Sequence, residues 1–299
     1  QAIYGFQIDL NTSFTGEDSL DVSIDAGNGV ASNTSTTSGT VTTWATALSE
    51  LDLNGGSDGL TVDGVSYTFP VGDNMTAIVG DNTDGSALFT TACAYGGPSN
   101  TLDDCGNVNA GITNGGFMVG AAYDFGNGVT TAVGYAGPET GIMTDESLDA
   151  YGANVAYTAD NYGVSLTYGV IESNAVATGE ENTYTALNAY YSFDNGMSVS
   201  AGYEVGTLGS AAAAQDETLA YFFGVEGEVG AGTLGASIGT AGSMTESGGK
   251  ITEAMMYEAY YSYPVNDGMT ITPLIYIKED TEATNPDETG IMVKTSFSF

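Results

Sequence analysis

The chain has 299 residues, with 38 acidic side chains, only 3 basic ones and no histidine, so that its formal net charge is −35 at pH 7. A nucleic-acid-binding protein needs a basic surface that neutralises phosphates, and this composition excludes that class. The lack of histidine also excludes the usual zinc sites and the hydrolases that rely on a histidine base. A content of 42% hydrophobic residues predicts an ordered chain.

Apolar and polar residues alternate along most of the chain, which is the pattern of β-strands with two different faces. The first predicted strands cover 2–15, 18–28, 60–71 and 74–81. The long link 29–59 contains the segment Trp44–Leu51, for which we expect a short helix.

A second long link, 82–114, contains both cysteines of the chain, Cys93 and Cys105. Under reducing conditions they would be two free thiols with no structural role. In an oxidising compartment they would form a disulfide that closes a loop and contributes about 3 kcal/mol. We predict the disulfide, because an exported acidic protein matures where thiols oxidise.

From residue 115 onward, one hairpin unit repeats to the end of the chain, where an alternating strand finishes on Phe299. The later strands are predicted over 115–126, 129–137, 147–160, 162–172, 182–194, 197–207, 217–230, 232–243, 252–264, 268–279 and 287–299. With the first four they make about fifteen strands. Bacterial single-chain barrels have even strand counts. We therefore expect one more strand, upstream of Gln1 or unrecognised within the chain.

The connections between these strands alternate between short and long. Tight Gly/Asn/Asp turns lie at 126–128, 160–161, 194–196, 230–232 and 266–268, and longer polar links lie between them. A soluble sandwich has no reason to gather its short turns at one end, whereas an outer-membrane barrel does so. The sequence therefore predicts an all-β fold over 1–299, a transmembrane antiparallel β-barrel of about 16 strands.

Aromatic residues gather just before the tight turns, as in the pairs Tyr123/Phe125, Tyr191/Phe193 and Tyr261/Tyr263. They share the apolar face, so that in a barrel they form an aromatic girdle at the membrane interface. The alternative is that they fill the core of a soluble sandwich.

The opposite face is polar or small, and in a barrel it lines a wet lumen. By parity it holds Gln7, Asp9, Asp21, Asp25, Asp124, Glu204, Glu226, Glu228, Glu258, Lys278 and Lys294. Carboxylates outnumber lysines in this set, so the sequence predicts a passage with weak cation preference. Lys278 and Lys294, on neighbouring strands, would form a local anion site.

The segment Ile8–Leu20 resembles the "LNTSFTGxDxL" stretch near the start of the barrel in cyanobacterial major outer-membrane porins, and Asp25–Gly29 resembles the Ala/Gly-rich stretch after it. The likeness is specific over about 25 residues, and basic residues common in that family are replaced here by acidic or neutral ones. In the family, a periplasmic surface-layer-homology module and a coiled coil precede the barrel; neither lies in 1–299. The resemblance implies a homotrimer that passes small solutes, mainly inorganic ions.

Long links in compact domains usually have a function, and in trimeric porins such a loop folds into the lumen and narrows it. We expect this of 82–114. The candidate constriction residues in or beside this link are Asp81, Asp84, Phe89, Tyr95, Asp103 and Asp104. The alternative is a surface flap or a loop at the contact between subunits.

The sequence thus favours a general-diffusion porin of the outer membrane, in contact with lipid and passing ions and small hydrophilic solutes. The alternatives are a plugged structural or adhesive barrel and a soluble secreted acidic β-protein. We expect no enzyme, because adjacent carboxylates such as Asp103 and Asp104 rarely flank one bond. No resident metal or cofactor is expected, although Ca²⁺ or Mg²⁺ can bind loosely at acidic loops.

Overall fold

The computed structural model describes residues 4–27, 32–37, 40–45, 59–98, 102–113, 116–144, 147–174, 180–209, 217–247, 250–251, 254–280 and 287–298. All regular elements in these ranges are β-strands. The described residues contain no helix long and apolar enough to cross a membrane. The terminal Phe299 lies outside the described residues.

Seventeen of the strands form one antiparallel sheet in which strands adjacent in the chain are also neighbours in space. The long strands are β1 (Gly5–Thr12), β2 (Ser19–Gly27), β5 (Thr61–Val71), β6 (Met75–Asp81), β7 (Phe117–Asp124), β8 (Val129–Gly137), β9 (Ala150–Thr158), β10 (Tyr162–Asn174), β11 (Glu180–Ser192), β12 (Met197–Thr207), β13 (Glu217–Val229), β14 (Gly232–Thr240), β17 (Met255–Asn266), β18 (Met269–Lys278) and β19 (Glu288–Phe297). Two short strands, β15 (Met244–Ser247) and β16 (Lys250–Ile251), follow β14 in the chain. β15 pairs with β13, and β16 pairs with β15, whereas β14 pairs directly with β17. The fifteen long strands correspond one by one to the strands predicted from the sequence.

A separate hairpin is formed by β3 (Ser32–Thr37) and β4 (Thr40–Ala45). The helix predicted for Trp44–Leu51 is therefore wrong at its start, because Trp44 pairs with Asn33 in this hairpin. Residues 46–51 lie outside the described residues. The threonines and the valine of the hairpin are β-branched and favour strands over helix.

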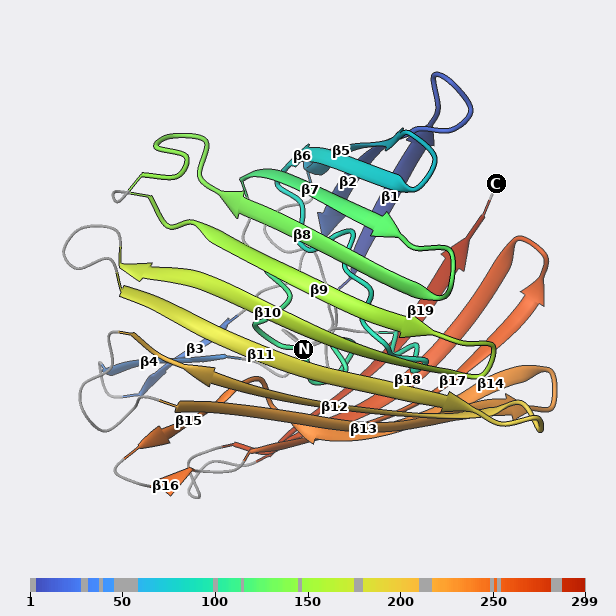
Figure 1. Cartoon of the computed structure of the whole chain (residues 1–299). Helices are drawn as coiled ribbons and strands as arrows, with labels where there is room; N and C mark the ends of the chain where they lie inside the picture. Colours follow the sequence, from blue (N-terminus) through green and yellow to red (C-terminus); the bar gives the residue numbers. More distant parts are fainter. Residues whose placement is uncertain are drawn as a thin grey trace.

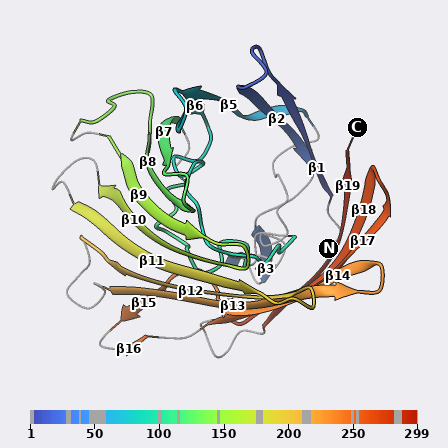
Figure 2. The same cartoon turned by 45° about the vertical axis from the view of Figure 1, so that its right-hand side comes forward.

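The sheet curls around an interior, so that β1 and β19 come to the same side of the molecule (Figures 1 and 2). Within the described residues, β1 pairs with β2 alone and β19 with β18 alone, so these two strands are the edges of the sheet. Because the number of long strands is odd, they run in the same direction. The described residues contain no further long strand between them, and the expectation of an even strand count stays a prediction.

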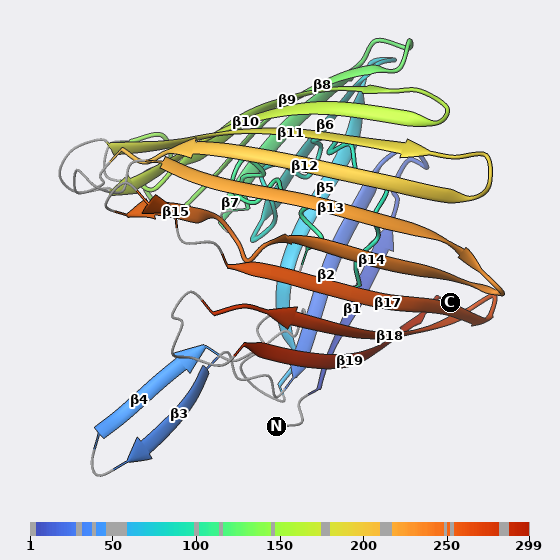
Figure 3. The same cartoon turned by 90° about the horizontal axis from the view of Figure 1, so that it is seen from below.

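The short turns gather at one end of the strands and the long connections at the other, as the view from below shows (Figure 3). The turn between β7 and β8 illustrates why the turns are tight. Gly126 and Gly128 adopt φ values of 73° and 85°, which glycine reaches without steric cost.

The two faces of the sheet differ in polarity. Along β12, every second residue from Ser198 to Gly206 is buried, and the residues between them are apolar or small and more exposed. The aromatic pairs Tyr123/Phe125 and Tyr191/Phe193 lie on the exposed face with their ring centroids 4.8 and 4.9 Å apart. The alternative that these aromatics fill a core is therefore wrong.

Candidate functional site

The polar residues predicted from parity share the inner face of the curved sheet, opposite the exposed apolar residues. On β12, Glu204 is 1% exposed, whereas its neighbours Tyr203 and Val205 are 50% and 44% exposed. On β1, Asp9 lies between Ile8 and Leu10, which belong to the exposed apolar face. The same alternation places the other predicted wall residues on the inner face: Gln7, Asp21, Asp25, Asp124, Glu226, Glu228, Glu258, Lys278 and Lys294.

The connection between β6 and β7 lies inside the curved sheet (Figure 2). We call residues 82–98 its outgoing limb and residues 102–113 its return limb. Neither limb contains a helix or a strand within these ranges. Their position is fixed instead by polar groups of the sheet wall.

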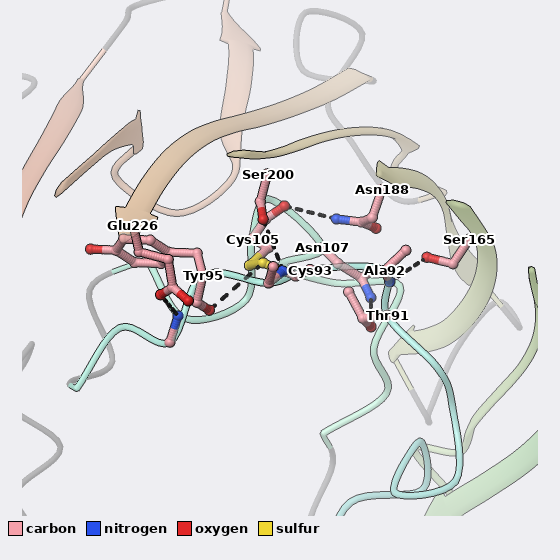
Figure 4. Close-up of a disulfide and its surroundings, with 12 residues drawn as sticks. Thr91, Ala92, Cys93, Tyr95, Cys105, Asn107, Ser165, Asn188, Ser200 and Glu226 are labelled. Carbon is pink, nitrogen blue, oxygen red and sulfur yellow. Dashed lines mark hydrogen bonds between the residues drawn. A yellow bond between two sulfur atoms is a disulfide. The ribbon is translucent and has the colours of Figure 1, made fainter. Parts of the chain in front are cut away.

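The outgoing limb donates every second backbone N–H, from residue 90 to residue 96, to a side chain of the wall. Figure 4 shows three of these wall side chains, Ser165, Ser200 and Glu226. These hydrogen bonds run from Thr90 to Asn154 (3.0 Å), Ala92 to Ser165 (2.8 Å), Ala94 to Ser200 (2.9 Å) and Gly96 to Glu226 (2.8 Å). The four acceptors lie on β9, β10, β12 and β13, so that this extended stretch of the limb crosses the wall strands. Since the donors are backbone groups, the ladder depends on the wall residues more than on the limb's own side chains.

The return limb is held chiefly by Glu204. This carboxylate accepts three hydrogen bonds of 2.8 Å, from the backbone N–H groups of Asn109 and Ala110 and from the side-chain amide of Asn109. Hydrogen bonds to an ionised acceptor are about twice as strong as neutral ones. Glu204 is therefore a strong anchor for this limb.

A disulfide joins the two limbs. Cys93 and Cys105 are bonded with their Cα atoms 6.4 Å apart, and Figure 4 shows the bond between the limbs. The side chain of Asn188 on β11 donates to the carbonyl of Cys105 at 2.8 Å. The disulfide thus links the outgoing limb, which is held by its backbone hydrogen bonds to the wall, to the return limb, which is held by Glu204.

Apolar packing adds to these polar contacts. Tyr95 lies against Phe222 and Tyr260, with ring centroids 5.4 and 5.6 Å away, in a buried cluster that also contains Leu102 and Met256. The Tyr95 hydroxyl donates to Glu258 at 2.6 Å. Burial, together with the nearby Glu258 carboxylate, raises the pKa of Tyr95, so that this phenol remains a donor.

Glycines of the wall let the limbs approach closely. A Cβ at Gly202 would overlap the carbonyl oxygen of Cys105, and a Cβ at Gly134 would overlap that of Gly85. No larger residue fits at either position while the limbs keep their place. These two glycines are therefore part of the wall surface against which the limbs pack.

The predicted constriction residues separate into two groups. Phe89 packs on the wall near Gly152, and Tyr95 is buried, so both rings hold the limb in place. Asp84, Asp103 and Asp104 are exposed to solvent in the interior, whereas Asp81 is the last residue of β6 and lies outside both limbs.

Asp104 has a perturbed acidity. Its enclosure by the protein, followed by the neighbouring charges of Asp103, Glu204 and Asp84, raises the pKa of Asp104 to about 7, although solvent reaches the side chain. Enclosure by the protein also raises the pKa of Asp84, although solvent reaches this side chain too. In both cases the enclosed space disfavours the charged form, and at Asp104 the neighbouring negative charges add to this effect.

We predict that the charge of the interior changes between pH 6 and pH 8. Because the pKa of Asp104 is raised to about 7, the carboxyl is mostly neutral at pH 6 and mostly ionised at pH 8. Cation preference, measured as the reversal potential across a KCl gradient, should therefore increase over this range. Asp104→Asn should remove the step, and a step of the same size in that variant would contradict the assignment.

The two lysines of the wall lie beside the limbs. Lys294 on β19 donates to the carbonyl of Pro98 at 3.1 Å. Lys278 lines a cavity of about 150 Å³ together with Leu102, Asp104 and Met256. As for metal ligands, the described residues contain no group of three or more His, Cys, Asp or Glu side chains that could hold an ion.

Sequence reasoning missed the neutral anchors of the wall: Asn154, Ser165, Asn188 and Ser200. In the sequence, each of them is a polar residue at a strand position that the alternation assigns to the inner face. That signal does not distinguish an anchor of the limbs from an ordinary lumen residue.

No protein-family model matches the chain, and no curated protein matches it in sequence. Its fold is nevertheless similar to solved bacterial porins. A triple mutant of the Rh. blastica porin has a TM-score of 0.58 at 13% identity, and a double mutant of the same porin has 0.59 at 12% identity. Each match covers 99% of this chain and 90% of the porin. A structure described as "Asymmetric conductivity of engineered proteins" matches with a TM-score of 0.59 at 13% identity over the same shares. The chain therefore has the antiparallel β-barrel fold of bacterial porins.

Proposed function

We propose that the protein is a general-diffusion porin, a passive water-filled channel for ions and small hydrophilic solutes across an outer membrane. The observation that carries this proposal is the reversed polarity of the sheet. Large apolar side chains are exposed on the outside, and solvent-exposed carboxylates such as Asp9, Asp124 and Glu228 lie on the inner face. A lipid-facing outer surface and a wet interior require this arrangement.

The preference of the channel for cations is part of the same proposal. It is supported by the excess of acidic residues on the inner face, where carboxylates outnumber lysines. Charges lining a narrow passage concentrate counter-ions and repel ions of their own sign.

Membership of the cyanobacterial porin family, outer-membrane localisation and a homotrimeric state are also proposals. They are supported by the Ile8–Leu20 likeness and by the porin fold. The soluble alternative is disfavoured by the apolar outer face.

A plugged structural barrel is the second candidate. It is favoured by one observation, the apolar cluster around Tyr95 and Phe222 that packs the limbs against the wall. This cluster would be the core of the plug.

Liposome swelling separates the two candidates. Vesicles that contain the purified protein should swell when exposed to small sugars and amino acids, at rates that fall as the solute becomes larger. Uniform impermeability of vesicles that contain correctly folded protein would support the plugged barrel and overturn the diffusion channel.

A further inference from the structure

The acidic residues of the inner face form two groups that differ in burial. Glu204 and Glu258 are 1% and 4% exposed, and both lie beneath the limbs. Asp9 is exposed, and Asp21 and Asp25 are half-buried, on the part of the wall formed by β1 and β2. Carboxylates of the inner face therefore lie in two different environments, one covered by the limbs and one open to solvent.

The first group is engaged by the limbs. Glu204 accepts three N–H groups of the return limb, Glu226 accepts the N–H of Gly96, and Glu258 accepts the hydroxyl of Tyr95. Glu226 also accepts a hydrogen bond of 2.8 Å from Tyr260. These carboxylates are satisfied by donors and are covered by the limbs that they hold.

The second group is distributed over the paired strands β1 and β2. In the register of β1 and β2, Asp9 is opposite Ser23, Asn11 is opposite Asp21, and Gln7 is opposite Asp25. The three aspartates are therefore spread along the length of the wall, and not gathered at one point.

The side chains that hold this second group are neutral. Asp9 accepts from Gln7 (2.8 Å) and Ser23 (2.7 Å). Asp21 accepts from Asn11 (2.5 Å) and Ser19 (2.6 Å), and Asp25 accepts from Thr61 (2.5 Å). Amide and hydroxyl donors orient a carboxylate without cancelling its charge. None of these donors is a cation that would neutralise the aspartates.

The limbs are anchored on the other side of the interior. Most of the wall residues that hold them by hydrogen bonds lie on β9 to β13 and on β17, and Figure 2 shows β1 and β2 across the interior from β9 to β13. Asp63 on β5 and Thr130 on β8 add one contact each. Lys294 on β19 donates to the carbonyl of Pro98, at the end of the outgoing limb. Space for solutes is thus shifted toward β1 and β2.

We propose that ions pass between the limbs and the wall formed by β1 and β2, and that Asp9, Asp21 and Asp25 are the wall residues that set the preference for cations, to which Asp104 on the facing limb adds. Glu204, Glu226 and Glu258 are positioning residues, which fix the limbs and thereby the width of the passage. The favoured solutes are small hydrated inorganic cations, for which the neighbouring serine, threonine and asparagine oxygens are suitable contacts. This inference rests on the proposed porin function.

The test compares two triple variants that change the charge of the chain equally. Asp9→Asn/Asp21→Asn/Asp25→Asn neutralises the wall, and Asp160→Asn/Asp194→Asn/Asp267→Asn neutralises three exposed acids of the tight turns. Reversal potentials are recorded in planar bilayers across a gradient of about 0.1 M KCl on the dilute side, where the screening length is about 10 Å. The wall variant should lower the cation-over-anion permeability ratio roughly twofold to fivefold, and the turn variant should leave it near the wild-type value.

A third variant tests the positioning group. Glu204→Gln retains the shape of the side chain but removes its charge and replaces one acceptor with a donor, so that the hydrogen bonds from Asn109 and Ala110 weaken. It should increase open-channel current noise and change the conductance, while the permeability ratio stays close to that of the wild type. A change in the permeability ratio as large as that of the wall variant would overturn the division of roles.

The outcomes separate this inference from the function on which it rests. A conducting protein whose wall variant keeps the wild-type reversal potential would overturn the inference and leave the porin function intact. A folded wild-type protein that does not conduct would overturn the porin function itself. If the wall triple variant does not fold, Asp9→Asn alone, at an exposed position, should still shift the ratio in the same direction, and an unchanged ratio would count against the inference.

Discussion

Replacing Gly202 with valine should lower the single-channel conductance by roughly half and make the open current noisier, because the passage narrows where the limbs are displaced. Gly202 lies on the inner face of β12 beneath the return limb. A Cβ at this position would overlap the carbonyl oxygen of Cys105 and lie 2.6 Å from the side-chain nitrogen of Asn188. The limb must move away from its wall, and the space on its other side is the proposed passage.

Ala201→Val provides the matched control for this experiment. Ala201 precedes Gly202 on the same strand but is exposed, on the opposite face. Two added methyl groups there should leave the conductance unchanged. A folded Gly202→Val protein with wild-type conductance and noise would show that the limbs do not border the conducting path.

Removing the disulfide should loosen the return limb much more than the sheet. In the chain-entropy model, a cross-link across a loop of this length contributes about 3 kcal/mol, and the two cysteines are 12 residues apart. For Cys93→Ala/Cys105→Ala, hydrogen exchange at the amides of Asn109 and Ala110 should accelerate by about two orders of magnitude. Alanine is the suitable replacement because Cys105 is only 1% exposed, and a hydroxyl there would need a partner.

Two comparisons make this measurement decisive. Reduction of the wild-type disulfide in detergent should reproduce the faster exchange, and amides in the middle of β11 and β12 should keep their protection. Unchanged exchange at Asn109 and Ala110 would mean that Glu204 holds the return limb without help from the cross-link.

The positions of the strands and turns could be predicted because they are encoded by residues that are close together in the sequence. Alternation with period 2 fixes the faces, and Gly, Asn and Asp at the turns fix the connections. For this reason the fifteen long strands and the inward parity of residues such as Asp9 and Glu204 follow from the sequence.

The arrangement of the interior could not be predicted in the same way. Ser165 and Ser200 hold the outgoing limb, whereas Ser23 only orients Asp9. All three are serines on the inner face of strands in which polar and apolar residues alternate. Which of them meets the limb depends on how the sheet curves and where residues 82–113 cross it. Both are properties of the assembled fold and not of any single strand.

The β3–β4 hairpin was missed for a different reason. Its threonine-rich strands carry no alternating apolar face, so that the period-2 signal that predicts the other strands is lacking here. A stretch of β-branched polar residues around Ser38-Gly39 is a hairpin signal that could have been used.

The central claim, that a water-filled passage runs beside fixed limbs, is tested most directly by the single-channel conductance of the unmodified protein in planar bilayers. We expect discrete, long-lived current steps whose size rises with KCl concentration, because ions would diffuse through water in the open part of the interior. Folded protein that inserts into the bilayer and produces no current steps would contradict the claim, because the limbs and their apolar cluster would then fill the interior.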